Sequence, residues 1–253
     1  MVVLSNNDGC VVSRSNEAKA LGVRMGQPWF ECKELADEHG ILALSSNYAL
    51  YADLSNRVMT ILCGYSPSAE VYSIDECFVD LTGTPELKAV SYDIRARVLQ
   101  WTGLPVCVGI GPTKTLAKLA NHVAKKHPRS KGVFNYNDLT DTQKAKLLSQ
   151  IPVDEVWGVG QRLTKRLAEH QINSVYDLQN AHTATLRAEF GVVMERTQRE
   201  LQETACIEMQ DIEPSKQQII SSRSFGQPVT ELAVLKDALS VFVANAAAKL
   251  RAQ

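Results

Sequence analysis

Two adjacent carboxylates inside an apolar stretch limit what this chain can fold into more than any other feature does. The stretch is VYSIDECFVDL, residues 71 to 81, and the carboxylates belong to Asp75 and Glu76. The surrounding β-branched and aromatic side chains predict a strand or tight hairpin that is half buried. Two negative charges there repel each other unless a cation lies between them, so we predict a divalent metal site. The alternative is a solvent-exposed hairpin tip, but such tips usually carry Gly or Asn beside Asp, whereas the neighbours here are Ile74 and Cys77.

The composition is that of a globular protein with more than one domain. With 253 residues and 45% hydrophobic content, the chain can bury a substantial core, and two or three small domains are expected rather than one. It contains no apolar run near roughly 18 residues and no basic start followed by an apolar core, so we expect a cytoplasmic protein. The six cysteines form no Cys-x-x-Cys pair and the five histidines no HExxH pattern. This favours reduced, mostly buried thiols over a zinc or disulfide framework.

Charge is segregated along the chain, although the formal net charge is only −1. No acidic residue lies between Asp93 and Asp138, whereas acidic residues collect around residues 31–38 and 200–213. A basic surface beside a carboxylate pair suits an enzyme that handles phosphate, because carboxylates hold metal and cations hold the polyanion. A solvated helix face would account for some of the lysines but not for the missing acids. The acid-free window carries eight cations: Arg95, Arg97, Lys114, Lys118, Lys125, Lys126, Arg129 and Lys131.

The order of the expected elements indicates a mixed fold. Around the hairpin of residues 71–81, a strand, helix, strand, helix and strand follow one another, which fits a split β-α-β, ferredoxin-like domain. Within TKTLAKLANHVAKK, the face formed by Leu116, Leu119, Ala120 and Val123 is expected to be buried, with the four lysines mostly off it. Expected strands are 2–4, 10–13, 106–111, 133–136 and 218–225. Expected helices are 16–22, 29–38, 48–63, 86–100, 113–126, 140–149 and 231–251. The apolar stripe of helix 48–63 consists of Leu50, Leu54, Ile61 and Leu62, and helix 140–149 begins with a Thr140–Gln143 capping box.

Short helices joined by glycine turns replace this pattern from about residue 138 to residue 204. In PVDEVWGVGQRLTKRL, Gly158 and Gly160 separate two expected helices. This is a helix-hairpin-helix candidate, in which glycines let backbone amides approach a DNA phosphate. Arg162, Lys165 and Arg166 follow and strengthen this interpretation over a plain turn. After residue 214 one strand and one helix remain, too little to bury a core, so we expect the start of a further domain.

Several motifs resemble those of one known family. SNEAKALGVRMG, SIDE, VGIGPTKTLAKLANHVAKK, VWGVGQRLTKRL and IISSRSFG occur in the order and spacing of the Y-family translesion DNA polymerases, across essentially the whole chain. The resemblance implies an α+β right-hand polymerase with a ferredoxin-like palm, small α/β fingers and a helix-hairpin-helix thumb. The implied boundaries are fingers 1–46, palm 47–137, thumb 138–213 and the beginning of a little finger at 214–253.

The resemblance also implies a role for individual residues. Asp75 and Glu76 match the catalytic palm carboxylates that hold two Mg²⁺ ions, and Lys19 and Lys125 match groups that bind the incoming triphosphate. The residues expected to contact DNA are Gly158, Gly160, Arg162, Lys165, Arg166 and Arg223. The implied function is translesion DNA synthesis in an SOS-type response to DNA damage. The implied partners are primer-template DNA, deoxynucleoside triphosphate, a UmuD-type accessory subunit, a recombinase filament and a sliding clamp.

The chain also departs from the family pattern. The family begins with a palm strand that carries a third carboxylate, followed by an aromatic residue that excludes ribonucleotides, and we expect this chain to start beyond both. We also expect most of the little finger and the clamp-binding tail to be missing, and hence little activity of the isolated chain. A catalytically inactive DNA-binding remnant is therefore one alternative. A nucleotide cyclase, which also places carboxylates at a ferredoxin-like hairpin, is the second.

Overall fold

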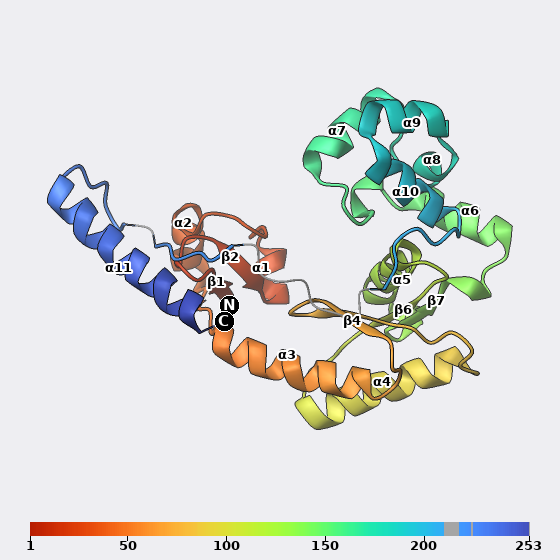
Figure 1. Cartoon of the computed structure of the whole chain (residues 1–253), viewed down its shortest axis with the longest axis horizontal. Helices are drawn as coiled ribbons and strands as arrows, with labels where there is room; N and C mark the ends of the chain where they lie inside the picture. Colours follow the sequence, from red (N-terminus) through yellow and green to blue (C-terminus); the bar gives the residue numbers. More distant parts are fainter. Residues whose placement is uncertain (210–217, 224, 253) are drawn as a thin grey trace. The chain divides into compact units, whose positions relative to one another are not determined.

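The computed structural model describes residues 1–209, 218–223 and 225–252 (Figure 1). It separates into two units, one formed by Met1–Asp53 with Pro214–Gln253 and the other by Leu54–Glu213. Helices and strands are mixed along both parts of the sequence, as the predicted α+β class requires. Within the described ranges, no helix is both long and apolar enough to cross a membrane. The domain boundaries expected at residues 46, 137 and 213 stay predictions.

A three-stranded sheet forms the first unit, because two short apolar segments flank the NNDG turn. Strand β1 (Val2–Leu4) pairs antiparallel with β2 (Val11–Arg14) and parallel with β3 (Ala43–Ser45). Asp8 adopts a φ of 55° in the turn, a conformation that Asp tolerates better than most residues. The strands expected at 2–4 and 10–13 are thus confirmed, with β2 displaced by one residue.

Two helices cover this sheet. Helix α1 (Asn16–Ala20) begins after Ser15, whose hydroxyl accepts a hydrogen bond from the backbone N–H of Ala18, and α2 (Trp29–His39) ends at Gly40 in the left-handed conformation. The helices expected at 16–22 and 29–38 are thus confirmed, with α1 two residues shorter and α2 one residue longer than expected. Apolar side chains from the strands and helices make a small core of Val2, Leu4, Val11, Ala18, Val23 and Cys32.

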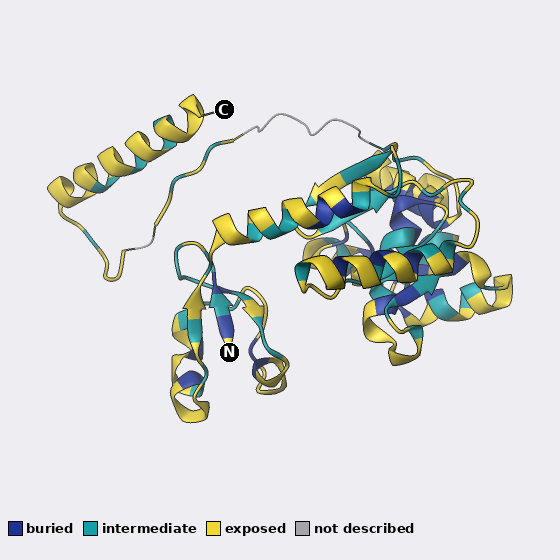
Figure 2. Ribbon diagram, turned by 90° about the horizontal axis from the view of Figure 1, so that it is seen from below, coloured by how far each residue is buried: buried dark blue, intermediate teal, exposed yellow. Residues whose placement is uncertain are grey.

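The strand expected at residues 218–225 is wrong for the part that the structure describes. Residues 218–223 and Phe225 carry no strand, and Ser224 lies outside the described residues. A strand needs a hydrogen-bonded neighbour, and no further strand follows in the described part of this segment. Helix α11 (Leu232–Arg251) forms as expected, yet none of its residues is buried (Figure 2).

The long helix α3 (Tyr48–Cys63) begins in the first unit and continues into the second, and its expected bounds are confirmed. Its buried residues are Val58, Met59 and Ile61, whereas Leu50 is 48% exposed, so the stripe expected through Leu50 is wrong at that end. The buried residues of α3 thus all lie in its C-terminal half. Val58 and Ile61 pack with Ile94 and Val98 of helix α4 (Leu87–Thr102).

The strands of the second unit follow the expected order but do not form one sheet. Strand β4 (Ala69–Ser73) pairs antiparallel with β5 (Glu76–Val79), and β6 (Val108–Ile110) pairs parallel with β7 (Val133–Asn135). Among the described residues these remain two separate two-stranded sheets. The continuous ferredoxin-like sheet expected from the sequence is therefore incomplete here. A cavity of about 650 Å³ is lined by residues of both β5 and β6.

Helix α5 (Lys114–Lys126) packs directly on β6, and glycine makes this close approach possible. A Cβ atom on Gly109 would lie only 2.0 Å from the backbone nitrogen of Asn121. The opposite, apolar side of α5 confirms the expected buried face, since Leu116, Leu119, Ala120 and Val123 are all buried. These four residues share a core with the helices that follow them in the sequence.

Those helices form a bundle, which we call the helical region. It consists of α6 (Asp141–Gln150), α7 (Gln161–Glu169), α8 (Val175–Asn180), α9 (Thr183–Phe190) and α10 (Val192–Leu201), with short 3₁₀ turns at Pro128–Ser130, Tyr136–Asp138 and Val153–Glu155 before and within it. The expected capping box of Thr140 and Gln143 at the start of α6 is confirmed.

A buried carboxylate joins α5 to the helical region. Glu200 in α10 is fully buried, and its carboxylate accepts hydrogen bonds from the backbone N–H groups of Thr115 at 3.1 Å, Cys206 at 2.7 Å and Ile207 at 3.0 Å. The Glu200 carbonyl also accepts from the Thr113 hydroxyl at 2.9 Å. Thr115 lies in the first turn of α5, where unpaired N–H groups and the helix dipole favour a negative charge.

We predict that Glu200→Gln lowers the free energy of unfolding by about 2–4 kcal/mol, because one N–H group would then face an amide donor instead of a carboxylate. Urea denaturation followed by circular dichroism measures this. The matched control is Glu203→Gln, which removes a charge paired with Lys144 near the surface and should cost less than about 1 kcal/mol. Equal effects of the two substitutions would contradict the role of Glu200.

Candidate active site

The two carboxylates lie at the tip of the β4–β5 hairpin. Ile74 and Asp75 form its turn, Ile74 is 47% exposed, and Glu76 is the first residue of β5. The expectation of a half-buried segment is therefore wrong at this point, and the hairpin-tip alternative describes the geometry. Ser73 supplies the local reason: its hydroxyl donates to the Asp75 carboxylate at 2.7 Å and accepts from the Asp75 N–H at 3.4 Å, which closes the turn without Gly or Asn.

Alternation along the two strands places four functional side chains on one face of the hairpin. Glu70 and Tyr72 are two residues apart on β4, Glu76 and Phe78 are two apart on β5, and Glu70 pairs directly with Phe78 across the ladder. This face is in contact with lysines of α5. The i, i+4 spacing of Lys114 and Lys118 puts both ammonium groups on the same side of that helix.

Each of these lysines is paired with a glutamate of the hairpin. Lys118 Nζ lies 2.9 Å from the Glu76 carboxylate, and Lys114 Nζ is paired with the carboxylate of Glu70. Lys114 also donates to the Glu208 carbonyl at 2.6 Å, and its side chain is only 7% exposed. Lys114 therefore lies off the apolar face of α5, as expected, and is nevertheless buried, because Glu70 compensates its charge inside the protein.

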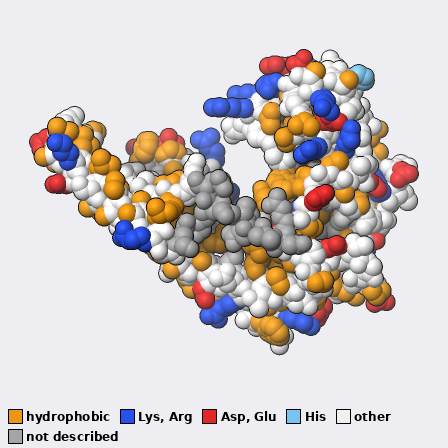
Figure 3. Space-filling model, in the orientation of Figure 1, with side chains coloured by type: hydrophobic (Ala, Val, Ile, Leu, Met, Phe, Trp, Pro, Cys, Tyr) orange, Lys and Arg blue, Asp and Glu red, His pale blue; other side chains and the backbone are white. Residues whose placement is uncertain are grey.

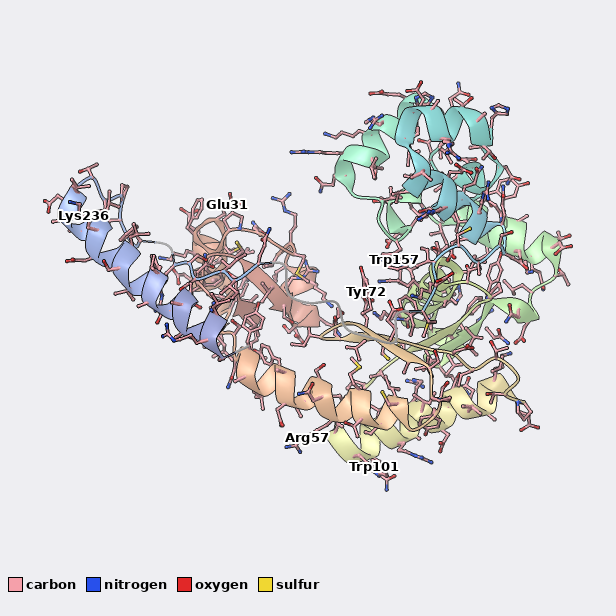
Figure 4. All side chains as sticks on the ribbon, viewed as in Figure 1. Glu31, Arg57, Tyr72, Trp101, Trp157 and Lys236 are labelled. Carbon is pink, nitrogen blue, oxygen red and sulfur yellow. The ribbon has the colours of Figure 1, made fainter. Side chains whose placement is uncertain are left out.

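Aromatic rings surround the same lysines. Lys118 Nζ lies 4.6 Å from the centre of the Tyr72 ring and 5.3 Å from that of Trp157, which stands before the glycine turn of the helical region. Figure 4 shows the labelled side chains of Tyr72 and Trp157 directed toward one another. Sequence reasoning missed Glu70, Tyr72, Lys118 and Trp157 as part of this site. The period-2 spacing of Glu70 with Tyr72 and the i, i+4 lysines were the available signals.

The basic surface expected from the acid-free window is only partly present. Besides Lys114 and Lys118, Arg97 pairs with Asp93 at 3.0 Å and Lys126 with Glu155 at 2.8 Å. The Arg95 guanidinium donates to backbone carbonyls of Val106 and Lys131. The acidic partners of Lys114, Lys118 and Lys126 come from the hairpin and the helical region, which a sequence window cannot reveal, whereas Asp93 lies only four residues before Arg97. The exposed members of the window include Lys125, Arg129 and Lys131.

The cysteine beside the acid pair is not poised for chemistry. Burial raises the pKa of the Cys77 thiol to about 11, so it stays protonated near neutral pH. Of the six cysteines, which are all free, Cys32 is fully buried and Cys63 is exposed. The expectation of mostly buried thiols is therefore wrong.

The predicted triphosphate-binding lysines lie in different units. Lys125 is exposed in the last turn of α5, seven residues after Lys118 and hence on the same side of the helix. Lys19 is exposed in α1 of the first unit, and Arg223 is exposed in the described stretch 218–223. The roles of Lys19, Lys125 and Arg223 stay predictions.

The glycine turn of the predicted helix-hairpin-helix is present and α7 follows it, but the helix expected before the turn is only the three-residue 3₁₀ helix Val153–Glu155. Gly158 has a φ of 85°, and Gly160 precedes α7 without a side-chain cap, while Val156 and Val159 beside them are buried. Arg162 and Lys165 are exposed on α7, where Lys and Arg side chains project in Figure 3. Arg166 has a structural contact in addition, because it donates to the Glu189 carbonyl at 2.7 Å and lies over the Phe190 ring.

Comparison with known proteins identifies what this chain is similar to. A model described as impB/mucB/samB family matches residues 1–122, and a model described as impB/mucB/samB family C-terminal domain matches residues 216–253. Protein UmuC of Salmonella typhimurium strain LT2 is 49% identical over 257 residues, and Protein ImpB of Salmonella typhimurium is 47% identical over 258 residues. Each alignment covers 100% of this chain and 60% of the relative.

A solved structure gives the same indication. The insertion ternary complex of Dbh DNA polymerase matches with a TM-score of 0.63 and 27% identity, over 76% of this chain and 55% of that protein. The resemblance and the Y-family fold class inferred from the sequence motifs are confirmed by these similarities. The chain spans about 60% of the length of the two relatives named above.

Substitutions in the buried pair of Lys114 and Glu70 should have non-additive effects on the free energy of unfolding. We predict that Lys114→Met alone lowers the free energy of unfolding by about 3 kcal/mol, because Glu70 would be left nearly buried without its cation. The double variant Lys114→Met, Glu70→Leu should recover most of this loss, since two apolar groups need no pairing. Urea denaturation of the two single variants and the double variant tests this, and strictly additive losses would contradict it.

Proposed function

Because the chain belongs to the impB/mucB/samB family of Y-family DNA polymerases, we propose that it performs template-directed nucleotidyl transfer past damaged bases. One observation carries the proposal beyond the family. Asp75 and Glu76 stand together at the tip of a hairpin, beside a cavity that residues of β5, β6 and α5 line. Carboxylates that can hold cations and lysines that can hold phosphates thus lie together beside this cavity.

The domains of this polymerase would divide the work. Residues 1–46 would form fingers that cover the incoming nucleotide, residues 47–137 a catalytic palm, and residues 138–213 a thumb that holds the duplex. Residues 214–253 would begin a little finger. The proposed place of action is translesion synthesis during SOS mutagenesis in the cytoplasm, at the nucleoid.

Mg²⁺ fits the donors that the hairpin offers. Among the described residues no group of three or more His, Cys, Asp or Glu side chains gathers, but Mg²⁺ is commonly held by one or two carboxylates together with waters and substrate phosphates. Asp75 and Glu76 would provide these carboxylates, with Asp75 oriented by the Ser73 hydroxyl. Two bound Mg²⁺ ions would make the primer 3′-hydroxyl a better nucleophile and stabilise the leaving pyrophosphate.

The chain's own cations would compensate the substrate charge. Lys125 from α5 and Lys19 from the fingers would hold the triphosphate, and Gly158 and Gly160 with the start of α7 would hold a DNA phosphate. The exposure of Lys125, Arg162 and Lys165 supports these assignments, since a phosphate can reach each of them. Catalysis would then consist mainly of positioning and charge neutralisation.

The partners follow from the same proposal. Primer-template DNA and deoxynucleoside triphosphate are the substrates, while a UmuD-type accessory subunit, a recombinase filament and a sliding clamp are proposed as protein partners. A nucleotide cyclase would not need the helix-hairpin-helix, and none of the similar proteins named above is a cyclase. The remaining alternative is a DNA-binding remnant without catalytic activity, which would bind DNA but would not extend a primer.

The primer-extension assay can be designed around the two small sheets, β4–β5 and β6–β7. Residues of β5 and β6 line the same cavity but do not pair with each other, so one further strand could join the two sheets. The resemblance implies that this strand carries a third carboxylate. We therefore propose testing the chain with one added strand that can pair with these two sheets.

With an added strand that carries Asp, the chain should extend a primer in Mg²⁺, whereas the same strand with Ala should improve solubility alone. In the Asp-bearing protein, Asp75→Asn or Glu76→Gln should reduce incorporation by at least about a hundredfold, since a misplaced reacting group costs that much. The denaturation midpoint and DNA affinity of both variants should stay near those of the parent. Normal extension by both variants would reject the proposed active site.

DNA binding should show little sequence preference and should weaken steeply with salt. Each neutralised phosphate contributes a slope of about −0.9 in log K against log salt for duplex DNA. Arg162→Ala with Lys165→Ala should weaken binding on every sequence alike and reduce the slope by about 2. Fluorescence anisotropy measures both quantities. The control is Lys146→Ala, which removes an exposed cation of α6 away from the glycine turn and should leave the slope unchanged.

A further inference from the structure

Three aromatic rings join the hairpin to the glycine turn of the helical region. The indole N–H of Trp157 donates to the Tyr72 hydroxyl at 2.8 Å, and the two ring centres lie 5.1 Å apart in an edge-to-face arrangement. Phe78 completes the group, 5.7 Å from Trp157 and 6.0 Å from Tyr72. The loop that is proposed to grip DNA therefore rests on the strand pair that carries the carboxylates (Figure 4).

Lys118 connects this aromatic group to the carboxylates. Its ammonium group lies over the rings of both Tyr72 and Trp157 and forms the 2.9 Å ion pair with Glu76. The side chain is 24% exposed, so the ion pair is only partly screened by water. One cation is thus shared between a proposed metal ligand and the contact of Trp157 with Tyr72.

A divalent cation at Asp75 and Glu76 would compete with this arrangement. Glu76 cannot give its oxygens fully to a metal ion while it also holds Lys118, and two cations on one carboxylate repel each other. Lys118 would have to leave Glu76, and its position over the two rings would change with it. Occupation of the carboxylates and the contact between loop and hairpin are then linked.

We propose that Lys118 is a positioning residue that holds Glu76 while no divalent cation is bound, and that its displacement by the cation loosens the contact between Trp157 and Tyr72. This proposal rests on the proposed metal site at Asp75 and Glu76. It adds a coupling between that site and the DNA-gripping loop. Because linkage is reciprocal, weakening the contact of Trp157 with Tyr72 must strengthen cation binding.

The test follows cation binding and the environment of Trp157 separately. Loss of the free Mn²⁺ signal in electron paramagnetic resonance measures cation binding. For Trp157, ¹⁹F resonances of the chain labelled with 5-fluorotryptophan are followed during Mg²⁺ addition, and Trp157→Phe assigns its signal among the three tryptophans. Mg²⁺ should move the Trp157 signal with the midpoint at which it displaces Mn²⁺, and should leave the Trp29 and Trp101 signals in place.

Variants separate coupling from simple charge effects. Lys118→Met should bind Mn²⁺ about fivefold more tightly, at the low end of usual coupling between two sites, and its Trp157 signal should no longer respond to Mg²⁺. Tyr72→Phe keeps the Lys118 charge and removes only the hydroxyl that Trp157 contacts, so it should raise Mn²⁺ affinity in the same direction by a smaller factor. Lys118→Arg keeps the cation and should behave like the parent.

Lys126→Met is the matched control on the same helix, because Lys126 pairs with Glu155 rather than with a hairpin carboxylate. It should leave both Mn²⁺ affinity and the Trp157 response unchanged. The coupling is rejected if Mn²⁺ binding requires Asp75 while the Trp157 signal is unmoved by Mg²⁺, or if Lys118→Met responds like the parent. If Asp75→Asn and Glu76→Gln bind Mn²⁺ as the parent does, the proposed metal site itself fails and the coupling fails with it.

Discussion

The buried carboxylate of Glu200 is the interaction on which the second unit depends. It holds the first turn of α5 and the segment after α10 at once, through backbone N–H groups that have no helical partner. A buried carboxylate without such donors would be strongly destabilising, and so would the donors without it. The orientation of α5 against α10 is therefore tightly determined, and α5 in turn orients the candidate site.

Helix α5 acts through two opposite faces. Its apolar face enters the core of the helical region, while Lys114 and Lys118 reach the β4–β5 hairpin. A two-stranded hairpin is only marginally stable alone, so its position depends on these side-chain contacts. The charges around Asp75 and Glu76 are thus arranged by a helix that begins about forty residues later in the sequence.

The candidate site keeps opposite charges together. Glu70 and Glu76 are neutralised by lysines, and the lysines lie over aromatic rings. Under the proposed function, metal ions and phosphates would compete with these internal ion pairs. Lys118 also contacts Trp157, whose hydrogen bond to Tyr72 spans 85 positions of the sequence.

The sequence by itself determined the local elements and the family. A linear pattern displays features that depend on residues within four positions of one another. Such features here are the Thr140–Gln143 capping box, the helix of Tyr48–Cys63 and the buried face of α5. Only the tertiary structure decided the exposure of Ile74, the burial of Lys114 and the loss of the strand at residues 218–223. Burial or strand pairing at each of these places depends on contacts with residues far away in the sequence. Lys114 and Lys118 meet their glutamates 44 and 42 positions away, and no local periodicity carries that information.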